Sequence, residues 1–340
     1  MKRKLIVLFF CLCGHLSACT DFVIKARDGS LVNGRSMEFG TDLHSELIIF
    51  PKGLHQQSTL PNGKKGMSWK VKYAYIGMNA FGLEFLSDGM NEKGLSIGAL
   101  WFPETKYPSI KGSATDKMIS LMDLENWLLG SFTTIQEVKR ALSEVEIWPQ
   151  EIPQINEVPP LHFALHDASG ASMVVEFVEG KMKIYDNHVA VLTNSPAFPW
   201  HVTNLRNYIS LSAMNVAPID LDGSVLSPTG QGSGLLGIPG DWTPPSRFVR
   251  IAIFKNFVNQ AQDAEKNANL AFHLLNTVDI PYGAIRDKKE QNYDYTQWVI
   301  VKDLTNRKIY WRTYEDLNIR EIDFTEALKK AGKQIKKIPL

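Results

Sequence analysis

The stretch C-T-D-F-V-I-K-A-R-D-G-S-L-V-N-G-R-S-M-E-F, residues 19–39, has the pattern of two β-strands joined by a tight turn. Residues 20–26 and 31–39 are β-prone, and R-D-G-S at residues 27–30 is a hairpin turn signal. Strand-like sequence starts at Cys19 itself. We therefore expect the fold to begin at this cysteine.

The first residues of the chain have the layout of a secretory signal peptide. Three basic residues at 2–4 precede an apolar run at 5–13 that is too short to span a bilayer, and the small pair Ser17-Ala18 follows. We expect residues 1–18 to be a signal peptide and residues 19–340 to form a single domain. The protein would then be exported.

The charge balance gives no reason to expect nucleic acid as a partner. The chain has 37 Lys+Arg and 36 Asp+Glu, and losing the three basic residues of the signal peptide leaves 34 basic residues against 36 acidic ones. A near-neutral surface lacks the positive field that attracts a phosphate backbone.

A cysteine at the first position of a mature chain combines a nucleophile and a base. Cys11 and Cys13 would leave with the signal peptide, so Cys19 would be the single remaining thiol. Its α-amine, with a reference pKa of about 7.7 to 8.0, can accept the proton of a thiol whose reference pKa is about 8.5. The thiolate can attack an amide carbonyl to give a thioester that water cleaves. Such a site also needs a cation beside the thiol and donors for the tetrahedral oxyanion.

The hairpin supplies candidates for the groups around the cysteine. If residues 28–29 form a two-residue loop, Glu38 lies directly opposite Cys19 and can hold the α-amine. Arg35 then falls on the other face of the hairpin. Using both residues requires a bulge, for which Gly34 is a suitable position.

The rest of the chain alternates runs of strands with runs of helices. Strand patterns occupy residues 73–102, 161–193 and 297–313. Helical patterns occupy residues 121–129, 134–145, 247–258 and 264–278, and T-I-Q-E at 134–137 is a capping box. This order fits stacked layers better than β-α-β units. Residues 217–245, rich in Gly, Pro and Ser, are expected to form a long functional loop.

Two other patterns are interpreted as ordinary structure. G-S-G-L-L-G at residues 232–237 matches a dinucleotide fingerprint by letter, but no strand precedes it and I-P-G prevents a helix from following. His162 and His166 would share one face of a strand without a third ligand at a recognisable spacing. We expect strand histidines there, and no metal site.

Short motifs spread over the mature chain occur in a distinctive order. They are C-T at 19–20, G-R-S-M-E-F at 34–39, M-N-E-K-G-L at 90–95, L-T-N-S-P at 192–196, the run 198–211, and G-I-P-G-D at 237–241 leading to S-R-F at 246–248. Together they resemble the choloylglycine hydrolases, which include bile salt hydrolases and penicillin V acylases. Each motif is weak alone, and their order and separation make the match specific.

The resemblance implies an α+β fold, the four-layer αββα sandwich of the N-terminal nucleophile hydrolases. It also implies cleavage of a non-peptide linear amide without metal or organic cofactor. Cys19 matches the nucleophile and amine base, and Arg35 and Arg247 match two arginines of the site that can favour the thiolate. Asn194 matches the side-chain donor of the oxyanion hole, and the backbone N–H of Trp101 matches the other donor.

Two residues depart from common patterns of the family. Glu38 stands where an aspartate is frequent, so its contact with the α-amine is shifted by one methylene. Trp101 stands where Gram-positive bile salt hydrolases commonly have asparagine and Gram-positive penicillin V acylases have tyrosine. Tryptophan resembles the exported Gram-negative branch, whose members cleave phenoxyacetyl amides and, in some cases, acyl homoserine lactones. We expect a small amide substrate with an aromatic or fatty acyl group, with a steroid acyl group in a conjugated bile salt as the alternative.

The segment at residues 198–222 resembles the assembly region of the family. Trp200, Leu205, Tyr208 and Leu211 offer apolar contacts there at near-helical spacing. We therefore expect a homotetramer.

A rival hypothesis comes from L-S-A-C at residues 16–19, which also fits a bacterial lipobox. Lipidation would place diacylglycerol on the sulfur and an acyl group on the amine, so the protein would be a lipid-anchored, non-catalytic lipoprotein of the outer membrane. Lipid-anchored domains usually follow their cysteine with a flexible tether, whereas strand-like sequence follows Cys19 at once.

Overall fold

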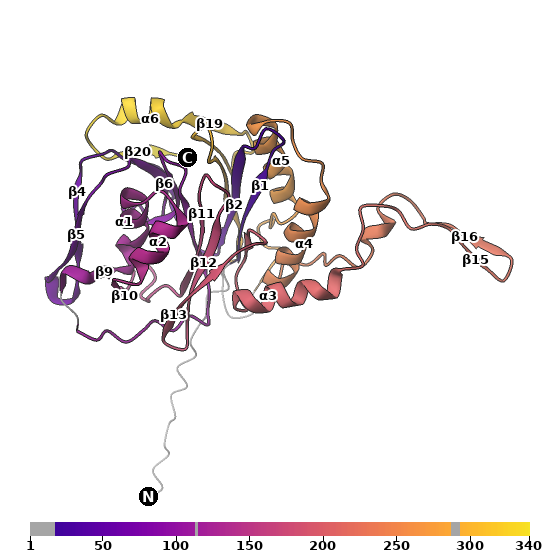
Figure 1. Cartoon of the computed structure of the whole chain (residues 1–340), viewed down its shortest axis with the longest axis horizontal. Coiled ribbons are helices and arrows are strands. Elements are labelled where there is room, and N and C mark those ends of the chain that lie inside the picture. The colour runs from indigo at the N-terminus through magenta and orange to yellow at the C-terminus, as the bar shows by residue number, and fades with distance from the viewer. Residues whose placement is uncertain (1–17, 113–114, 287–292) are drawn as a thin grey trace, which may run out of the picture.

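The hairpin at residues 19–39 lies in the middle of a six-stranded antiparallel sheet (Figure 1). The computed structural model describes residues 18–112, 115–286 and 293–340, so the predicted signal peptide lies outside the described residues except for Ala18. The sheet has the order β14-β1-β2-β17-β18-β19. Its strands are β1 (Ala18–Lys25), β2 (Leu31–Phe39), β14 (Val191–Leu192), β17 (Tyr295–Asp303), β18 (Lys308–Thr313) and β19 (Arg320–Asp323).

A second antiparallel sheet of eight strands faces the first. Its order is β13-β12-β11-β8-β7-β6-β3-β20. Its strands are β3 (Glu46–Phe50), β6 (Tyr75–Asn79), β7 (Leu86–Asn91), β8 (Ser96–Trp101), β11 (Leu161–His166), β12 (Ser172–Val178), β13 (Lys181–Asp186) and β20 (Lys336–Pro339). The small pairs β4 (His55–Thr59) with β5 (Lys65–Lys70) and β9 (Met118–Ser120) with β10 (Glu146–Trp148) lie outside it.

Helices cover the outer faces of both sheets. The helices α4 (Pro244–Phe257) and α5 (Ala264–Asn276) pack on β1, β2 and β17, whereas α1 (Leu124–Ser131) packs on β7 and β8. Figure 1 shows α2 (Ile135–Leu142) beside α1. The remaining helices are α3 (Phe198–Asn204) and α6 (Phe324–Ala331). The predicted α+β fold and the four-layer αββα sandwich are thus confirmed.

Coverage of both sheets explains the composition of the central strands. Every residue of β1 and β2 is buried except Lys25. A strand that is buried on both faces reads as a nearly continuous apolar run, and polar residues within it need partners inside the protein. None of the described helices is long and apolar enough to cross a membrane.

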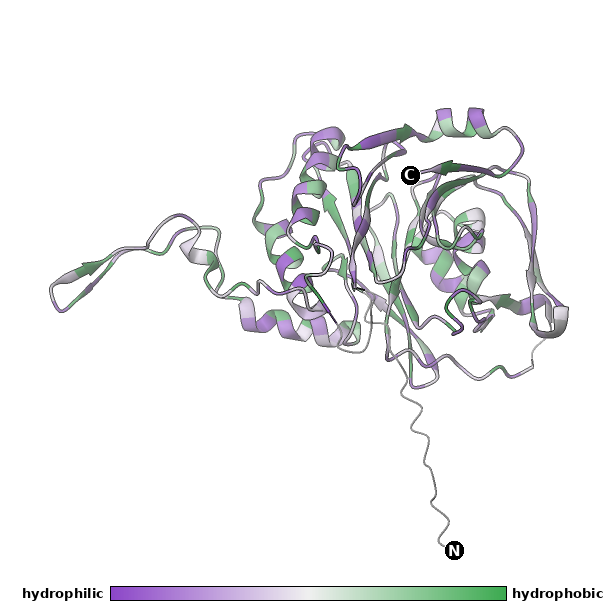
Figure 2. Ribbon diagram, turned by 180° about the vertical axis from the view of Figure 1, so that it is seen from behind, coloured by the Kyte–Doolittle hydropathy of each residue, from purple (hydrophilic) through white to green (hydrophobic). Residues whose placement is uncertain are grey.

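The expected loop at residues 217–245 contains a hairpin that the sequence analysis missed. The strands β15 (Ile219–Leu221) and β16 (Ser224–Leu226) are joined by Asp222-Gly223, both with positive φ, which is the type I′ turn that D-G favours. This hairpin projects far from the body of the molecule, and hydrophobic residues occur along it (Figures 1 and 2). All six residues of its two strands are exposed.

Two hairpin glycines allow a matched test of packing against backbone strain. Gly29 and Gly94 both end three-residue hairpin loops with φ of 90° and 83°. A Cβ at Gly29 meets no atom within 4 Å, whereas one at Gly94 would collide with the carbonyl oxygen of Leu304. We expect Gly29→Ala to lower the free energy of unfolding by about 1 kcal/mol and Gly94→Ala by roughly 2–5 kcal/mol. Urea denaturation measures both, and equal losses would contradict the packing explanation.

Candidate active site

The register of the β1/β2 hairpin differs by one residue from the predicted one. Cys19 pairs with Met37, because the turn is a three-residue loop at residues 27–29 closed by a left-handed glycine. Glu38 consequently lies opposite Ala18. The predicted pairing of Glu38 with Cys19 is wrong.

The corrected register places Arg35 on the same face as Cys19. Arg35 pairs with Asp21, two residues after the cysteine, and the ladder continues past Gly34 without an irregularity. The predicted bulge at Gly34 is therefore also wrong. Gly34 instead makes room for Phe22, whose Cζ would lie 2.9 Å from a Cβ at residue 34.

The Arg35 guanidinium is fully buried beside the thiol. Its Nη2 lies 3.9 Å from Cys19 Sγ and donates a hydrogen bond to the carbonyl oxygen of Ala99. Its Nη1 lies 3.8 Å from Asp88 Oδ2. Burial acts to lower the pKa of Arg35, but the charges of Cys19, Asp88 and Asp21 outweigh burial and raise it. Arg35 is thus a cation placed where it favours the thiolate.

Asn194 and Arg247 contact the main chain of Cys19. The Cys19 N–H donates to Asn194 Oδ1 at 2.7 Å, and Arg247 Nη2 donates to the same oxygen at 2.7 Å. Arg247 Nη1 donates to Cys19 O at 2.5 Å and to Thr20 Oγ1 at 2.7 Å. Burial lowers the pKa of Arg247 against the raising effect of Glu38 and Cys19. Two predicted site residues that are distant in sequence therefore meet the cysteine in the fold.

Trp101 lies at the end of β8, next to Asn194. Its carbonyl oxygen accepts a hydrogen bond from Asn194 Nδ2 at 2.8 Å. Its indole packs edge to face on Phe39, with ring centroids 5.5 Å apart. The two groups expected to bind the oxyanion, the Asn194 amide and the Trp101 backbone, are thus neighbours. Their role in binding it stays a prediction.

Glu38 lies on the face of the hairpin opposite to that of Cys19, and it is fully buried. Its Oε1 accepts a hydrogen bond from Thr296 Oγ1 at 2.8 Å. Burial raises the pKa of Glu38 to about 7, although the charge of Arg247 opposes the shift. In the described chain Ala18 still precedes Cys19, so the expected contact of Glu38 with a free α-amine stays a prediction.

An apolar pocket opens beside Cys19. Most of the described residues that line it are apolar, and polar side-chain groups come only from Cys19, Ser87 and the indole N–H of Trp101. The others are Met37, Phe39, Leu43, Ala80, Phe81, Phe85, Ala99, Ile152, Ile155, Pro159 and Leu161. The free volume is about 50 Å³, well below the roughly 300 Å³ of a small ligand pocket. The pocket therefore suits a slim apolar group.

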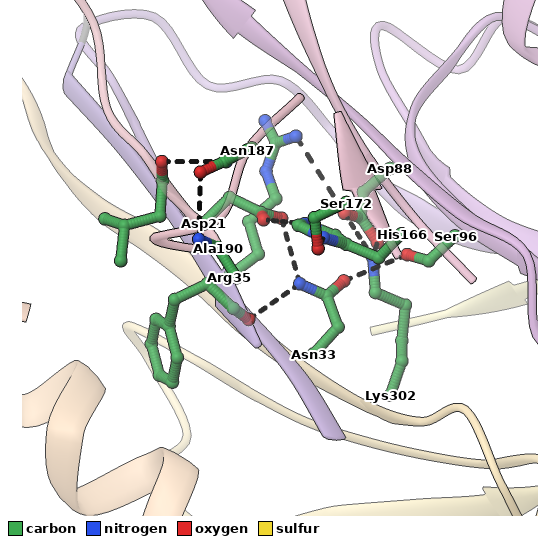
Figure 3. Close-up of polar contacts among 12 residues, drawn as sticks. Asp21, Asn33, Arg35, Asp88, Ser96, His166, Ser172, Asn187, Ala190 and Lys302 are labelled. Atoms are coloured by element: carbon green, nitrogen blue, oxygen red, sulfur yellow. Dashed lines mark hydrogen bonds and ion pairs between the residues drawn. The ribbon is translucent and has the colours of Figure 1, made fainter. Parts of the chain in front are cut away.

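A buried polar network near the thiol was not expected from the sequence (Figure 3). Asp21 accepts hydrogen bonds from His166 Nε2 at 2.6 Å and from Asn33 Nδ2 at 3.1 Å. Lys302 Nζ lies 2.5 and 2.6 Å from the two carboxylate oxygens of Asp88. The sequence does contain a signal for such a network, because a charged residue inside an apolar strand needs a buried partner. Asp88 in L-S-D-G-M-N and Lys302 in W-V-I-V-K are two such residues.

Two buried histidines hold the loop that carries Asn194. His162 Nε2 donates to Thr193 O at 2.8 Å, and His201 Nε2 donates to Asn194 O at 2.9 Å. Burial lowers the pKa of His201 to about 4, so its ring is neutral at pH 7. His162 also contacts Glu176 Oε1 at 3.1 Å. Within the part of the chain that the structure describes, no three His, Cys, Asp or Glu side chains group as metal ligands.

The chain matches the family model of linear amide C-N hydrolases, choloylglycine hydrolase family, over residues 19–331. It is 33% identical over 312 residues to a bile salt hydrolase/transferase of Clostridium perfringens, covering 91% of this chain and 93% of that protein. A mutant conjugated bile acid hydrolase from C. perfringens is similar in structure, with a TM-score of 0.84, 32% identity and coverage of 95% and 97%. Penicillin V acylase from Agrobacterium tumefaciens is similar with a TM-score of 0.77, 26% identity and coverage of 94% and 91%.

The position of Asn194 generates a test with a matched control. If its amide donates to the oxyanion, Asn194→Ala should lower kcat roughly 100- to 1000-fold with a smaller change in KM, because the donor acts mainly in the transition state. Asn187 is also buried, and among the residues that the structure describes its side chain bonds the turn at Ala190 and Val191 alone. Asn187→Ala should therefore reduce stability and leave kcat near that of the wild type. An unchanged kcat in Asn194→Ala would show that Asn194 does not stabilise the oxyanion and is only a residue of the turn.

Proposed function

Because the chain belongs to the choloylglycine hydrolase family of linear amide C–N hydrolases, we propose that it cleaves a small-molecule amide with Cys19 as an N-terminal nucleophile. The observation that carries this proposal is the place of Cys19 Sγ, 3.9 Å from the buried Arg35 cation and at the wall of the apolar pocket. A thiol beside a cation is poised to ionise, and the pocket holds the acyl group of the amide.

The first step depends on cleavage of the chain before Cys19. The freed α-amine takes the thiol proton, and the thiolate attacks the amide carbonyl. Glu38 supports this arrangement, because it lies opposite Ala18 in the ladder and so flanks the place where the amine forms. Arg247 holds the carbonyl oxygen of Cys19 and keeps the first residue in place after cleavage.

The tetrahedral intermediate carries a negative oxygen that needs donors. The Asn194 side-chain amide and the backbone N–H of Trp101 are the groups we assign to it. The protonated α-amine then gives its proton to the leaving amine, the C–N bond breaks, and a thioester remains on Cys19. Water activated by the same amine hydrolyses the thioester and frees the thiol.

The pocket supports an aromatic or fatty acyl group as the first choice of substrate. Its apolar lining offers little to hydrogen-bond a polar substituent, which favours a phenoxyacetyl group or a fatty chain. Phenoxyacetyl amides and acyl homoserine lactones are therefore our leading substrates. Conjugated bile salts are the second candidate, favoured by the 33% identity to a bile salt hydrolase/transferase.

Burial of Cys19 argues against the lipoprotein hypothesis. The residue is 1% exposed, and its sulfur lies between Arg35 Nη2 and Met37 Sδ. A diacylglyceryl group on this sulfur would have to lie inside the protein, beside a buried cation. We therefore propose that the mature protein is exported to the periplasm with an unmodified cysteine.

An added residue before Cys19 separates the amine mechanism from other cysteine mechanisms. A variant that retains Ala18 keeps the thiol and every distant partner, but it converts the α-amine into an amide that accepts no proton near neutral pH. We expect it to lose hydrolysis of phenoxyacetyl or acyl homoserine lactone substrates almost as completely as Cys19→Ala. Its melting temperature should stay close to that of the processed protein. Full activity, with mass spectrometry showing Ala18 still attached, would refute self-activation.

The projecting hairpin supports assembly into a homotetramer. Apolar side chains that are more than half exposed lie along this arm and the segment before it, among them Ile209, Met214, Ile219 and Val225. Exposed apolar residues gathered on one extension are typical of an interface between copies. We expect the mass of a tetramer by light scattering at micromolar concentration, and a monomer would contradict the proposal.

A further inference from the structure

Three buried charged side chains, Arg35, Asp88 and Lys302, lie next to one another between the two sheets (Figure 3). Arg35 of β2 lies between the Cys19 sulfur, 3.9 Å from Nη2, and Asp88 of β7, 3.8 Å from Nη1. Lys302 of β17 lies beyond Asp88 and contacts both of its carboxylate oxygens. Arg35, Asp88 and Lys302 are all fully buried. One anion is therefore shared by two cations, and only one of these cations reaches the thiol.

The hydrogen bonds show how Asp88 is shared. Both of its oxygens accept from Lys302 Nζ, whereas Arg35 approaches it without a hydrogen bond. Arg35 Nη1 and Nε have no hydrogen-bond partner among the described residues. Without Lys302, the buried carboxylate would lack its partner, and the free Nη1 of Arg35 would be the nearest donor. Arg35 would then turn toward Asp88 and away from the sulfur.

The space around Arg35 is also shaped for this position. Gly98 of β8 lies against the guanidinium, and a Cβ at residue 98 would collide with Arg35 Nη1 and lie 3.2 Å from Asp88 Oδ2. The hydrogen bond from Arg35 Nη2 to Ala99 O fixes the other end of the group. A small residue and a backbone acceptor therefore accommodate the guanidinium in its position between the sulfur and Asp88.

We propose that the Asp88–Lys302 ion pair is a positioning pair that holds Arg35 against Cys19 and leaves its positive charge available to the thiolate. The proposal rests on the proposed function only in taking Cys19 as the reacting thiol. Lys302 neutralises the charge of Asp88. Asp88 therefore does not cancel the positive charge of Arg35. The pair touches no substrate and acts through Arg35 alone.

The other charged and titratable groups around the thiol come from five elements. Asp21 is on β1 and bonds His166 of β11. Burial acts to raise the pKa of Asp21, but His166, Lys302 and Arg35 hold it below the usual value. Glu125 of α1 is buried, and burial raises its pKa well above the usual value. The remaining groups are Arg247 of α4, which bonds the main chain of Cys19, and Glu38 of β2, whose charge acts on Arg247 from the other face of the hairpin. All of them stay unchanged in the variants below.

The test measures the pH dependence of Cys19 alkylation by iodoacetamide in the processed protein, followed by mass spectrometry of the Cys19 peptide. Only the thiolate reacts, so the midpoint reports the thiol pKa, whereas access to the buried sulfur changes only the plateau. In Lys302→Met, Arg35 is the cation that remains beside Asp88 and would turn toward it. We therefore expect the alkylation midpoint to rise by about one pH unit or more. Asp88→Asn removes the anion, and we expect the midpoint to fall.

Charge and packing are separated by the double variant and by a control. Lys302→Met with Asp88→Asn restores the charge balance, so its midpoint should return to within about half a pH unit of the wild type. If the single variants instead acted by damaging the structure, the double variant would deviate from the wild type at least as far as either single variant. Lys337→Met removes a lysine that lies 3.5 Å from Glu46 and has no charged contact with Arg35, Asp88 or Lys302 among the described residues, and it should leave the midpoint unchanged. Melting temperatures identify any variant that fails to fold. If Lys302→Met fails to fold, the midpoint of Asp88→Asn still tests the proposal.

A higher alkylation midpoint in Lys302→Met together with a lower midpoint in Asp88→Asn supports the proposal. Shifts in the same direction, or unshifted midpoints in both, would overturn it. Alkylation requires no amide substrate, so the result is distinct from the fate of the proposed function. A wild-type protein that hydrolyses no amide but shows the opposite shifts would refute the function and support the positioning pair.

Discussion

The site depends on one constraint, which is that the positively charged guanidinium of Arg35 is buried inside the protein. Burying a guanidinium costs several kcal/mol unless opposite charges and hydrogen-bond acceptors surround it. Arg35 has no exposed surface, and its neighbours are the thiol of Cys19, the carboxylate of Asp88 and the carbonyl oxygen of Ala99. Each neighbour comes from a different strand. The two sheets must therefore pack in one arrangement for this cation to be tolerated.

The space between the sheets has a charged end and an apolar end. The charged end contains Asp21, Asp88 and Lys302, and the apolar end is the pocket walled by Phe39 and Trp101. Cys19 lies at the boundary between them. A side chain at such a boundary has an apolar surface on one side and buried charges on the other, and these charges act more strongly than they would in water because the interior has a low dielectric constant.

The main chain of Cys19 is held as firmly as its side chain. Its N–H bonds Asn194 and its carbonyl oxygen bonds Arg247, so both ends of Cys19 are anchored by distant segments. His162 and His201 in turn hold the carbonyl oxygens of Thr193 and Asn194. Pre-organised donors of this kind avoid reorganisation when charge develops in a reaction.

Local chemistry determined much of the fold in advance. The R-D-G-S turn predicted the hairpin, the capping box of Thr134 and Glu137 formed, and strand and helix runs indicated stacked layers. The register of the hairpin was off by one residue, because D-G favours a two-residue type I′ loop and both possible loops place the glycine at positive φ. Gly29 has φ of 90°, but Asp28 lacks the positive φ that a type I′ turn requires, so the loop has three residues. That single residue decided that Arg35, and not Glu38, shares the face of Cys19.

The sequence by itself determined the candidate nucleophile, the turn chemistry and, through ordered motifs, the partners Arg35, Asn194 and Arg247. These depend on residue type and on short-range order, both of which can be read along the chain. The ion pair of Asp88 with Lys302 was decided only by the tertiary structure, because its members are 214 residues apart and lie on different sheets. A charge within an apolar strand signals that a partner must exist, but only the packing of the sheets selects which residue it is.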